Sequence, residues 1–137
     1  TRNQAVEYSN LARSLERMMD HAYQMAQLIE ENNDTVIEQS EQPIAQLIEW
    51  QDTLKRLMIN IRTRNSNEIE ECRQALKTSQ QDILNFEDDL IGNRKLSKQD
   101  LLLFRMAESI RRMCAYARDF GEILLNLKLY DEMIVRN

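Results

Sequence analysis

The sequence predicts an all-α protein, an up-and-down antiparallel helical bundle of four long helices. Three observations carry this prediction. First, the 137 residues include only two glycines and one proline, so the chain lacks the turn residues that sheets and tight loops need. Second, apolar residues recur at alternating intervals of three and four, the period of a helix that buries one face. Third, the links between these periodic segments are short, which favours antiparallel neighbours.

The first predicted helix covers residues 2–31, where the alternation of three and four holds without a break. Its predicted core stripe consists of Tyr8, Leu11, Leu15, Met18, Ala22, Met25 and Ile29, widened by Ala5, Ala12, Met19 and Ala26. Residues 32–42 are predicted as a linker, because Asn32, Asn33 and Asp34 favour turns. We therefore expect a long helix that buries one apolar stripe.

Residues 43–137 are predicted to form three further helices. The second covers about 42–64 with Pro43 in its first turn, and the third covers about 67–91 with Gly92 as its stop signal. The fourth begins at Ser97, a helix cap with Asp100 three residues on, and continues towards Ile134. The predicted core stripes are Leu47, Trp50, Leu54, Leu57 and Ile61, then Ile69, Cys72, Leu76, Ser79, Ile83, Phe86 and Leu90, then Leu103, Met106, Ile110, Met113, Ala117, Phe120, Leu124 and Leu127.

The chain is acidic, with a net charge of -5 and a pI near 5.0. An acidic surface disfavours direct binding to nucleic acid and to anionic lipid, both of which need basic residues. No apolar run reaches the roughly 20 residues of a membrane span, so we expect no membrane insertion and a cytoplasmic location. The first residues show neither a signal-peptide profile nor an initiator methionine, which favours a trimmed piece of a longer chain.

The sulfur-containing and aromatic residues fit the same core. Cys72 and Cys114 both fall on apolar stripes, so we expect buried, reduced thiols, with a disulfide or a redox role as the alternative. Four of the seven methionines also fall on the stripes, which favours gap-filling core residues over a methionine-rich binding groove. Trp50 is interpreted as a core anchor for the same reason.

An internal repeat relates the first helix to the fourth at an offset of 95 residues. The identical pairs are Ala12 with Ala107, Ser14 with Ser109, Arg17 with Arg112, Met18 with Met113, and Ala22 with Ala117. Shared periodicity explains the apolar matches, but it does not explain the matching serine and arginine. The first helix is therefore predicted to close one repeat, and residues 43–137 are predicted to form a complete three-helix repeat. Without the other helices of the first repeat, part of the apolar stripe of the first helix is expected to stay uncovered, which predicts self-association or packing of this helix across the second bundle.

Two segments carry a resemblance to a known family. The segment LARSLERMMDHAYQMAQLI, residues 11–29, resembles the closing helix of a PhoU domain, whose signature is a Leu-Glu-Arg-Ile-x-Asp-His-Ala type stretch. The segment AESIRRMCAYARDFGEILLNL, residues 107–127, resembles the corresponding helix of the second repeat, especially in archaeal phosphate-uptake regulators. The resemblance spans nearly the whole chain, and its specific part is the closing-helix motif.

The resemblance implies a helical adaptor and regulator. PhoU proteins are built from three-helix repeats, act with phosphate transporters and their sensor kinases, and repress the phosphate-starvation response. Some relatives join this domain to an AbrB-like DNA-binding domain, and others append it to sodium–phosphate cotransporters. Any such part would lie upstream of Thr1.

The resemblance also implies a metal hypothesis. The family's metal-binding signature is an acidic residue, three others and then Asp, and some members bind multinuclear iron or zinc clusters there. The matching residues in this chain are Glu16 and Asp20, which share one helix face because they are four residues apart. His21 supplies a nitrogen to the same region, but it lies about 100° around the helix from Asp20, which strains one site that uses all three.

A solvated helix face is the competing interpretation of the same pair. Arg13 and Arg17 flank Glu16 and offset the repulsion between the two carboxylates. The acidic signature is absent from the second repeat, where the matching positions are Arg111 and Ala115. Acids of the third helix join the site only if that helix packs beside it, namely Glu71, Asp82, Glu87 and Asp88.

The remaining residues do not form a recognisable catalytic motif in the sequence. No serine or cysteine can be placed beside His21, and two glycines do not make a phosphate-binding loop. Arg111 and Arg112 offer a phosphate site, but ion pairs with Glu108 and nearby acids are favoured. The leading hypothesis is a non-enzymatic regulator that works through protein contacts and self-association and requires no cofactor. The alternatives are an iron- or zinc-binding bundle with a sensing or enzymatic role, and a structural coiled-coil fragment.

Overall fold

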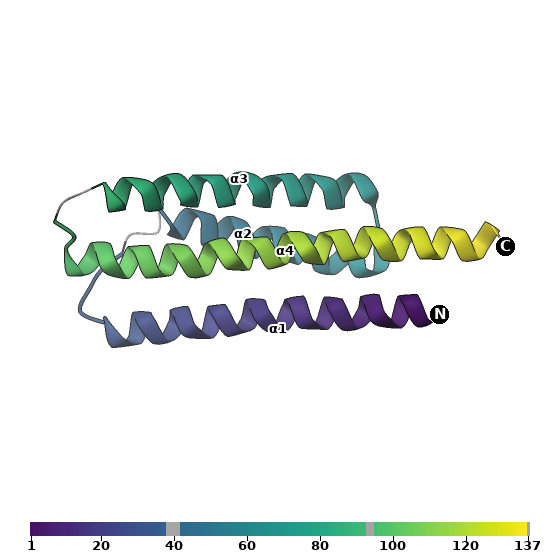
Figure 1. Ribbon diagram of the computed structural model, residues 1–137, viewed down its shortest axis with the longest axis horizontal. Helices are drawn as coiled ribbons and strands as arrows, with labels where there is room; N and C mark the ends of the chain where they lie inside the picture. The colour runs from purple at the N-terminus through teal and green to yellow at the C-terminus, as the bar shows by residue number, and fades with distance from the viewer. Residues whose placement is uncertain (38–41, 93–94, 137) are drawn as a thin grey trace.

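The computed structural model describes residues 1–37, 42–92 and 95–136, and within them the chain forms helices and no strand. The four helices are α1 (Arg2–Glu31), α2 (Ile44–Thr63), α3 (Ser66–Ile91) and α4 (Lys98–Arg136). Their bounds lie within about two residues of those that the periodicity predicts. Successive helices run in opposite directions along a common axis (Figure 1), so the predicted up-and-down bundle is confirmed.

The four helices do not contact one another equally. α2, α3 and α4 pack against each other as a three-helix unit, whereas α1 packs against α4 alone. No Cα atom of α1 lies within 8 Å of a Cα atom of α2 or α3. In Figure 1, α1 and α3 lie on opposite sides of α4. The short-link argument therefore fails for α1 and α2, which follow one another in the chain without packing together.

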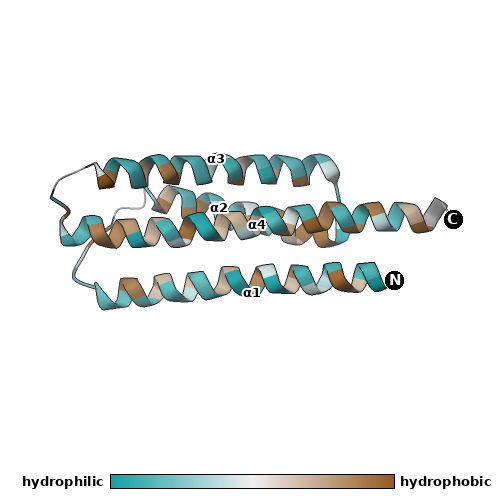
Figure 2. Ribbon diagram, in the orientation of Figure 1, coloured by the Kyte–Doolittle hydropathy of each residue, from teal (hydrophilic) through white to brown (hydrophobic). Residues whose placement is uncertain are grey.

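α4 is the central helix, because it contacts all three others. Its apolar residues accordingly spread around much of its circumference, as the brown bands along this helix in Figure 2 show. The buried apolar residues of α4 are Leu102, Leu103, Met106, Ala107, Ile110, Met113, Cys114, Ala117, Phe120, Ile123, Leu124 and Leu127. At Gly121 the side chain of Arg73 from α3 lies close to α4, because a Cβ atom there would meet Cγ of Arg73 at 2.9 Å. This packing explains a glycine inside a helix, where alanine is intrinsically favoured.

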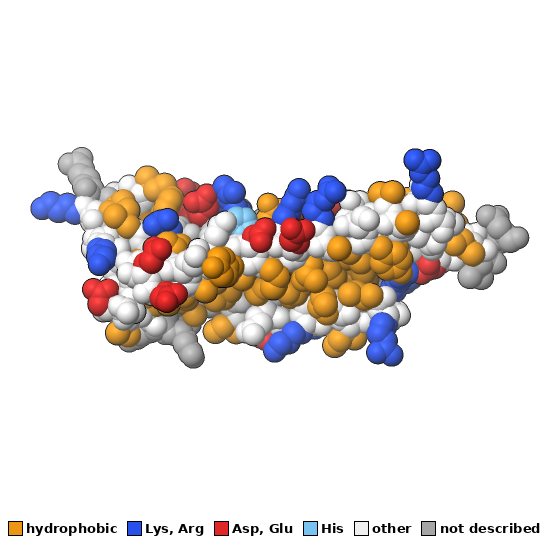
Figure 3. Space-filling model, turned by 90° about the horizontal axis from the view of Figure 1, so that it is seen from below, with side chains coloured by type: hydrophobic (Ala, Val, Ile, Leu, Met, Phe, Trp, Pro, Cys, Tyr) orange, Lys and Arg blue, Asp and Glu red, His pale blue; other side chains and the backbone are white. Residues whose placement is uncertain are grey.

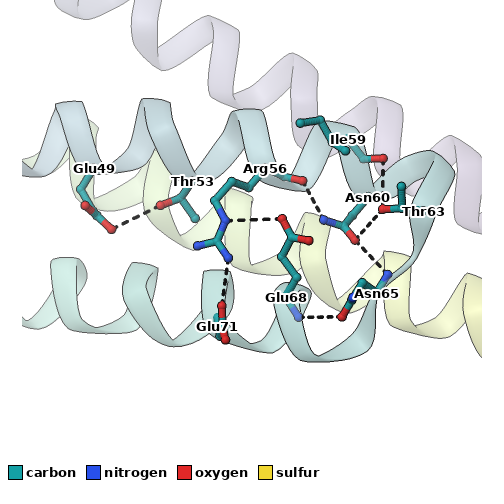
Figure 4. Close-up of polar contacts among 9 residues, drawn as sticks. All are labelled: Glu49, Thr53, Arg56, Ile59, Asn60, Thr63, Asn65, Glu68 and Glu71. Atoms are coloured by element: carbon teal, nitrogen blue, oxygen red, sulfur yellow. Dashed lines mark hydrogen bonds and ion pairs between the residues drawn. The ribbon is translucent and has the colours of Figure 1, made fainter.

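The connection between α2 and α3 is fixed by Asn60, whose side chain is fully buried. Its Nδ2 donates to the backbone oxygen of Arg56 at 2.8 Å, and its Oδ1 accepts from the Thr63 hydroxyl and from the Asn65 backbone N–H, both at 2.9 Å (Figure 4). Arg64, between these groups, adopts the left-handed conformation with φ 48°. One buried amide thus satisfies three polar groups where the chain reverses.

The helix ends confirm several predicted signals. The Ser97 hydroxyl accepts from the Asp100 backbone N–H at 3.1 Å, and the Asp100 carboxylate accepts from the Ser97 N–H at 3.0 Å, so the capping box is formed. Gly92 follows α3 as expected, but its φ is -65° and it ends the helix without a left-handed turn. Cys72 and Cys114 are buried free thiols, and Trp50 is buried.

The predicted core stripe of α1 is wrong in part. Leu11, Met18 and Met25 are buried, but the side chains of Tyr8, Met19 and Ile29 are 47%, 45% and 45% exposed. The flanking Ala5, Ala12 and Ala26 are exposed as well. The physical reason is that α1 has one neighbour only, so one narrow stripe meets α4 and the rest of the apolar face meets none of the described helices.

Candidate functional site

The two residues of the metal hypothesis, Glu16 and Asp20, are both exposed on α1. Among the described residues, no group of three or more His, Cys, Asp or Glu side chains is placed to hold a metal ion. The acids of α3 do not join them, because α1 and α3 do not contact. Glu71 instead accepts from Arg56 at 3.0 Å, and Glu87 accepts from Arg111 at 2.9 Å. The metal assignment therefore stays a prediction that rests on two carboxylates.

His21 turns away from this pair and towards α4. Its imidazole stacks on the ring of Tyr116, with ring centroids 5.8 Å apart and planes inclined by 24°. Burial, followed by the positive charge of Arg112, lowers the pKa of His21 below its ordinary value of 6.5, while the charges of Asp20 and Glu108 act in the opposite direction. The imidazole is therefore neutral near pH 7 and acts in the packing between the two helices.

The contact around Tyr116 also joins equivalent positions of the predicted repeat. His21 and Tyr116 are 95 residues apart, so each is the repeat counterpart of the other. The guanidinium carbon of Arg17 lies 5.6 Å from the centre of the Tyr116 ring, and its counterpart Arg112 acts on His21. α1 and α4 run antiparallel (Figure 1), and equivalent positions of the predicted repeat meet at this contact. The division into repeats stays a prediction.

A polar pocket of about 310 Å³ lies beside His21, between α1 and α4. Its lining carries the guanidinium groups of Arg105 and Arg112 and the carboxylates of Glu31 and Glu108. Arg112 donates to Glu108 at 2.9 Å, as the sequence predicts, and Arg111 is bound to Glu87. The charges of this pocket therefore balance one another, which does not favour an anion over a neutral ligand.

A strip of hydrophobic side chains runs along the face of the molecule formed by α1 and α2 (Figure 3), and we call this surface the α1–α2 groove. One end is closed by Tyr8, whose hydroxyl lies 2.6 Å from Nη2 of Arg64 at the end of α2. Because this contact turns the Tyr8 flank of α1 towards α2, the apolar residues on that flank form one wall of the groove. The wall on α1 consists of Tyr8, Ala12, Leu15, Met19, Ala22 and Ala26.

The opposite wall comes from the apolar flank of α2. Ile61 lines the same end hollow as Tyr8, and the helix period places Leu54, Met58 and Leu47 on the same flank. Leu47, Leu54 and Ile61 are half-buried against the core, whereas Met58 is 40% exposed. Figure 3 shows the resulting strip of hydrophobic side chains running along the molecule, with charged side chains on both edges. This patch is long for a protein that acts as a free monomer.

The two thiols are poor nucleophiles. Desolvation by burial raises the pKa of Cys114 to about 12, and burial also raises the pKa of Cys72. The thiolate is the reactive form of cysteine, and the raised pKa values favour the protonated, less reactive form of both thiols near pH 7. Both act as small core residues, in agreement with their positions on the predicted stripes.

The sequence predicts an uncovered part of the α1 stripe, but it predicts neither the opposite wall on α2 nor the role of Tyr116. The signal for the groove is the excess of apolar residues beyond the predicted stripes, such as Ala12 and Met19 on α1 and Met58 on α2. A stripe wider than one helix contact indicates a second contact surface. The signal for Tyr116 is the offset of 95, which pairs it with His21.

Comparison with known proteins leaves the function to be argued from the residues. No protein-family model, curated protein or solved structure matches this chain. In the part of the chain that the structure describes, no helix combines the length and the apolar character needed to cross a membrane.

Proposed function

We propose that this chain is a non-enzymatic regulatory domain that works through protein contacts made at the α1–α2 groove. The observation that carries the proposal is the uncovered apolar strip between two helices that have no Cα atoms within 8 Å of each other. Grooves of this kind bind the apolar face of a helix, since helix-in-groove recognition uses hydrophobic residues spaced at i, i+3 and i+7. α1 and α2 line the groove side by side over a long distance. This elongated shape fits a helical partner better than a small molecule.

The resemblance to PhoU domains gives the proposal its biological content. The repeated closing-helix motif, with its serine and arginine, favours a role in the control of phosphate uptake and of phosphate-starvation signalling. The partners would then be components of a phosphate transporter or of its sensor kinase. Support for a non-catalytic role comes from the raised thiol pKa values and from the packing of His21 against Tyr116.

The test is direct binding to purified partners from the organism that encodes the chain. The cytoplasmic ATPase subunit of its phosphate transporter and the cytoplasmic part of its phosphate sensor kinase would be immobilised in turn for interferometry. We expect binding to at least one of them, weakened about tenfold or more by Met58→Asp in the groove wall, because a charge would be buried against apolar surface. Leu84→Asp, on the exposed face of α3, is the matched control.

The two possible failures have different meanings. Absence of binding to both proteins would contradict the phosphate-control role. Equal binding by the Met58→Asp and Leu84→Asp variants would instead show that the partner uses a different surface, which contradicts the groove.

The metal-binding alternative is tested separately by calorimetric titration of the metal-free chain with iron and with zinc. We expect no saturable uptake, because two exposed carboxylates supply too few ligands and His21 faces Tyr116. Saturable uptake that disappears in a Glu16→Gln, Asp20→Asn double variant would reinstate the metal hypothesis.

A further inference from the structure

We infer that the α1–α2 groove is occupied by the same groove of a second copy of this chain, related by a two-fold axis that runs parallel to the helices. The inference rests on the proposed function, because it names a partner for the same surface. Two features of the groove support it: the distribution of charge along its two edges, and the relative positions of α1 and α2 along the bundle.

The two edges of the groove carry opposite charges. Helix arithmetic places Glu16 on the outward crest of α1, directly opposite the residues that face α4, with Asp20 close to it. On α2, Lys55 occupies the outward crest and Arg62 lies beside it, about two turns further along. In Figure 3, acidic side chains border the middle of the hydrophobic strip on one edge, with basic side chains beyond them, and basic side chains lie along the opposite edge. An acidic edge and a basic edge make the surface complementary to itself.

Glu16 and Lys55 are both available to a partner. Each side chain is exposed, and in the described part of the chain neither takes part in an ion pair. Among the described residues no ion pair joins Glu16 to Arg13 or Arg17, and Arg17 lies over the ring of Tyr116 instead. The charged edges are therefore free to contribute to recognition between chains.

The two charges also lie at the same height. The contact between Tyr8 and Arg64 fixes these positions at one level of the bundle. α1 and α2 run antiparallel (Figure 1), and each rises about 1.5 Å per residue, so Glu16, eight residues beyond Tyr8, is level with Arg56, eight residues before Arg64. Lys55 is adjacent to Arg56, so the axial offset between Glu16 and Lys55 is only about 1.5 Å.

Because Glu16 and Lys55 lie at the same height, a two-fold axis parallel to the helices is favoured over one perpendicular to them. Rotation about an axis parallel to the helices leaves the height of every residue unchanged and places α1 of each copy over α2 of the other. Glu16 of each copy then faces Lys55 of the other, which gives two ion pairs in one isologous interface. An axis perpendicular to the helices instead lays α1 on α1 and brings the acidic edges together, where like charges oppose association.

One like-charged pair opposes the favoured arrangement. Asp20 is level with Asp52 by the same count, so these two carboxylates approach each other across the interface. Both lean away from the groove, by about 40° and 60° from Glu16 and Lys55 around their helices. They therefore lie at the outer edge, where water and salt screen their repulsion. The buried centre of the interface consists of the apolar walls, including Met19 and Met58.

The test measures the mass of the full chain by sedimentation equilibrium over a range of concentrations. We expect the native sequence to approach twice the chain mass of 16.3 kDa. Glu16→Lys and Lys55→Glu, each alone, convert both ion pairs into like-charge contacts and should weaken the dimer about tenfold or more. Neither change affects folding, because both residues are exposed.

The decisive measurement mixes the two single variants. The Glu16→Lys chain is positive at both positions and the Lys55→Glu chain is negative at both, so every contact between them in a mixed dimer joins opposite charges. We expect the mixture to form mixed dimers at least as tight as the native dimer, and the Glu16→Lys, Lys55→Glu double variant to self-associate again. Met19→Asp should abolish association, whereas Leu84→Asp, the control on α3, should leave it unchanged.

Three results would overturn the inference. A native chain that stays monomeric at high micromolar concentration excludes the dimer. Tighter self-association of Glu16→Lys alone would indicate the perpendicular axis. Unchanged association in Met19→Asp would place the interface elsewhere. Binding to a phosphate transporter or sensor kinase is measured separately, so a monomeric chain that still binds either protein would overturn the inference and leave the proposed function standing.

Discussion

α1 and α3 are both long amphipathic helices that pack against α4, yet the apolar face of α3 is buried more completely than that of α1. Every residue of the predicted α3 stripe is buried except Phe86, which is half-buried, because α4 covers one side of that face and α2 covers the other. In α1, Tyr8, Met19 and Ile29 stay exposed, because α4 is its only neighbour among the described helices. The comparison teaches that periodicity identifies the residues that favour burial, while the number of neighbouring helices decides which of them are buried.

The largest difference between α3 and α1 is expected when one apolar side chain on each helix is truncated. Leu76→Ala on α3 should lower the unfolding free energy by about 3 kcal/mol, because Leu76 is fully buried and its truncation leaves a cavity in the core. Met19→Ala on α1 should cost less than about 0.5 kcal/mol at concentrations where the chain is monomeric, because its side chain is already 45% exposed. Urea unfolding followed by circular dichroism measures both. Equal costs in dilute monomer would mean that α1 is covered as fully as α3.

The next largest effect on stability is expected at the turn that joins α2 to α3. This turn is fixed by the buried side chain of Asn60. Asn60→Ala removes three hydrogen bonds and leaves the Asn65 N–H without its partner, so it should cost about 2 kcal/mol. Asn67→Ala, at an exposed position in the first turn of α3, should be nearly neutral. The same urea titration compares the two variants, and a neutral Asn60→Ala would show that the turn is held by the left-handed Arg64 backbone alone.

A smaller effect is expected at the start of α4, the helix that both α1 and α3 depend on. Ser97→Ala removes the side-chain oxygen that accepts from the Asp100 N–H and should lower stability by about 1 kcal/mol. Ser97→Thr retains that oxygen and should recover most of the loss. A thermal melt separates the two variants, and an equal loss in both would assign the effect to something other than the cap.

The smallest expected effect concerns the contact between α1 and α4. The pKa of His21 should lie below 6.5, and NMR titration will report it directly, because the chain has one histidine. Arg112→Gln should raise this pKa towards 6.5, and Glu108→Gln should lower it further. A pKa at or above 6.5 in the native chain would contradict the packing of His21 on Tyr116.

The same shift has a consequence for stability. Since the unfolded chain binds a proton at His21 more readily than the folded chain does, stability should fall as the pH decreases from 6.5 through the folded-state pKa. His21→Phe keeps a ring against Tyr116 but removes the titrating group, so this part of the pH dependence should vanish.

Much of the fold could be predicted from the sequence. The helix bounds follow from periodicity, the start of α4 follows from Ser97 and Asp100, and the core positions of Met18, Met113 and Cys114 follow from their stripes. These signals are local, because a cap or a stripe acts within one or two helical turns. The role of Asn60 could not be predicted in this way, since its partners become visible only when the chain reverses around it.

The candidate site was less predictable. The spacing of Glu16 and Asp20 places them on one face, but spacing does not tell whether a second helix brings further ligands, and none of the described acids of α3 reaches them. The separation of His21 from Asp20 was predicted from helix geometry and agrees with the observed stack on Tyr116. The groove depends on which helices fail to touch, and that property belongs to the assembled chain.

The attachment of α1 through a single helix has a consequence for motion. When α1 separates from α4, it breaks contacts with that helix and leaves the packing among α2, α3 and α4 intact. Amide protons of α1 should therefore exchange with solvent through a partial opening of the bundle. The opening free energy should be lower than for α3, where exchange requires disruption of the whole three-helix unit. α1 can therefore separate from α4 while the three-helix unit stays folded. A partner bound in the α1–α2 groove holds α1 against α4 and suppresses this opening.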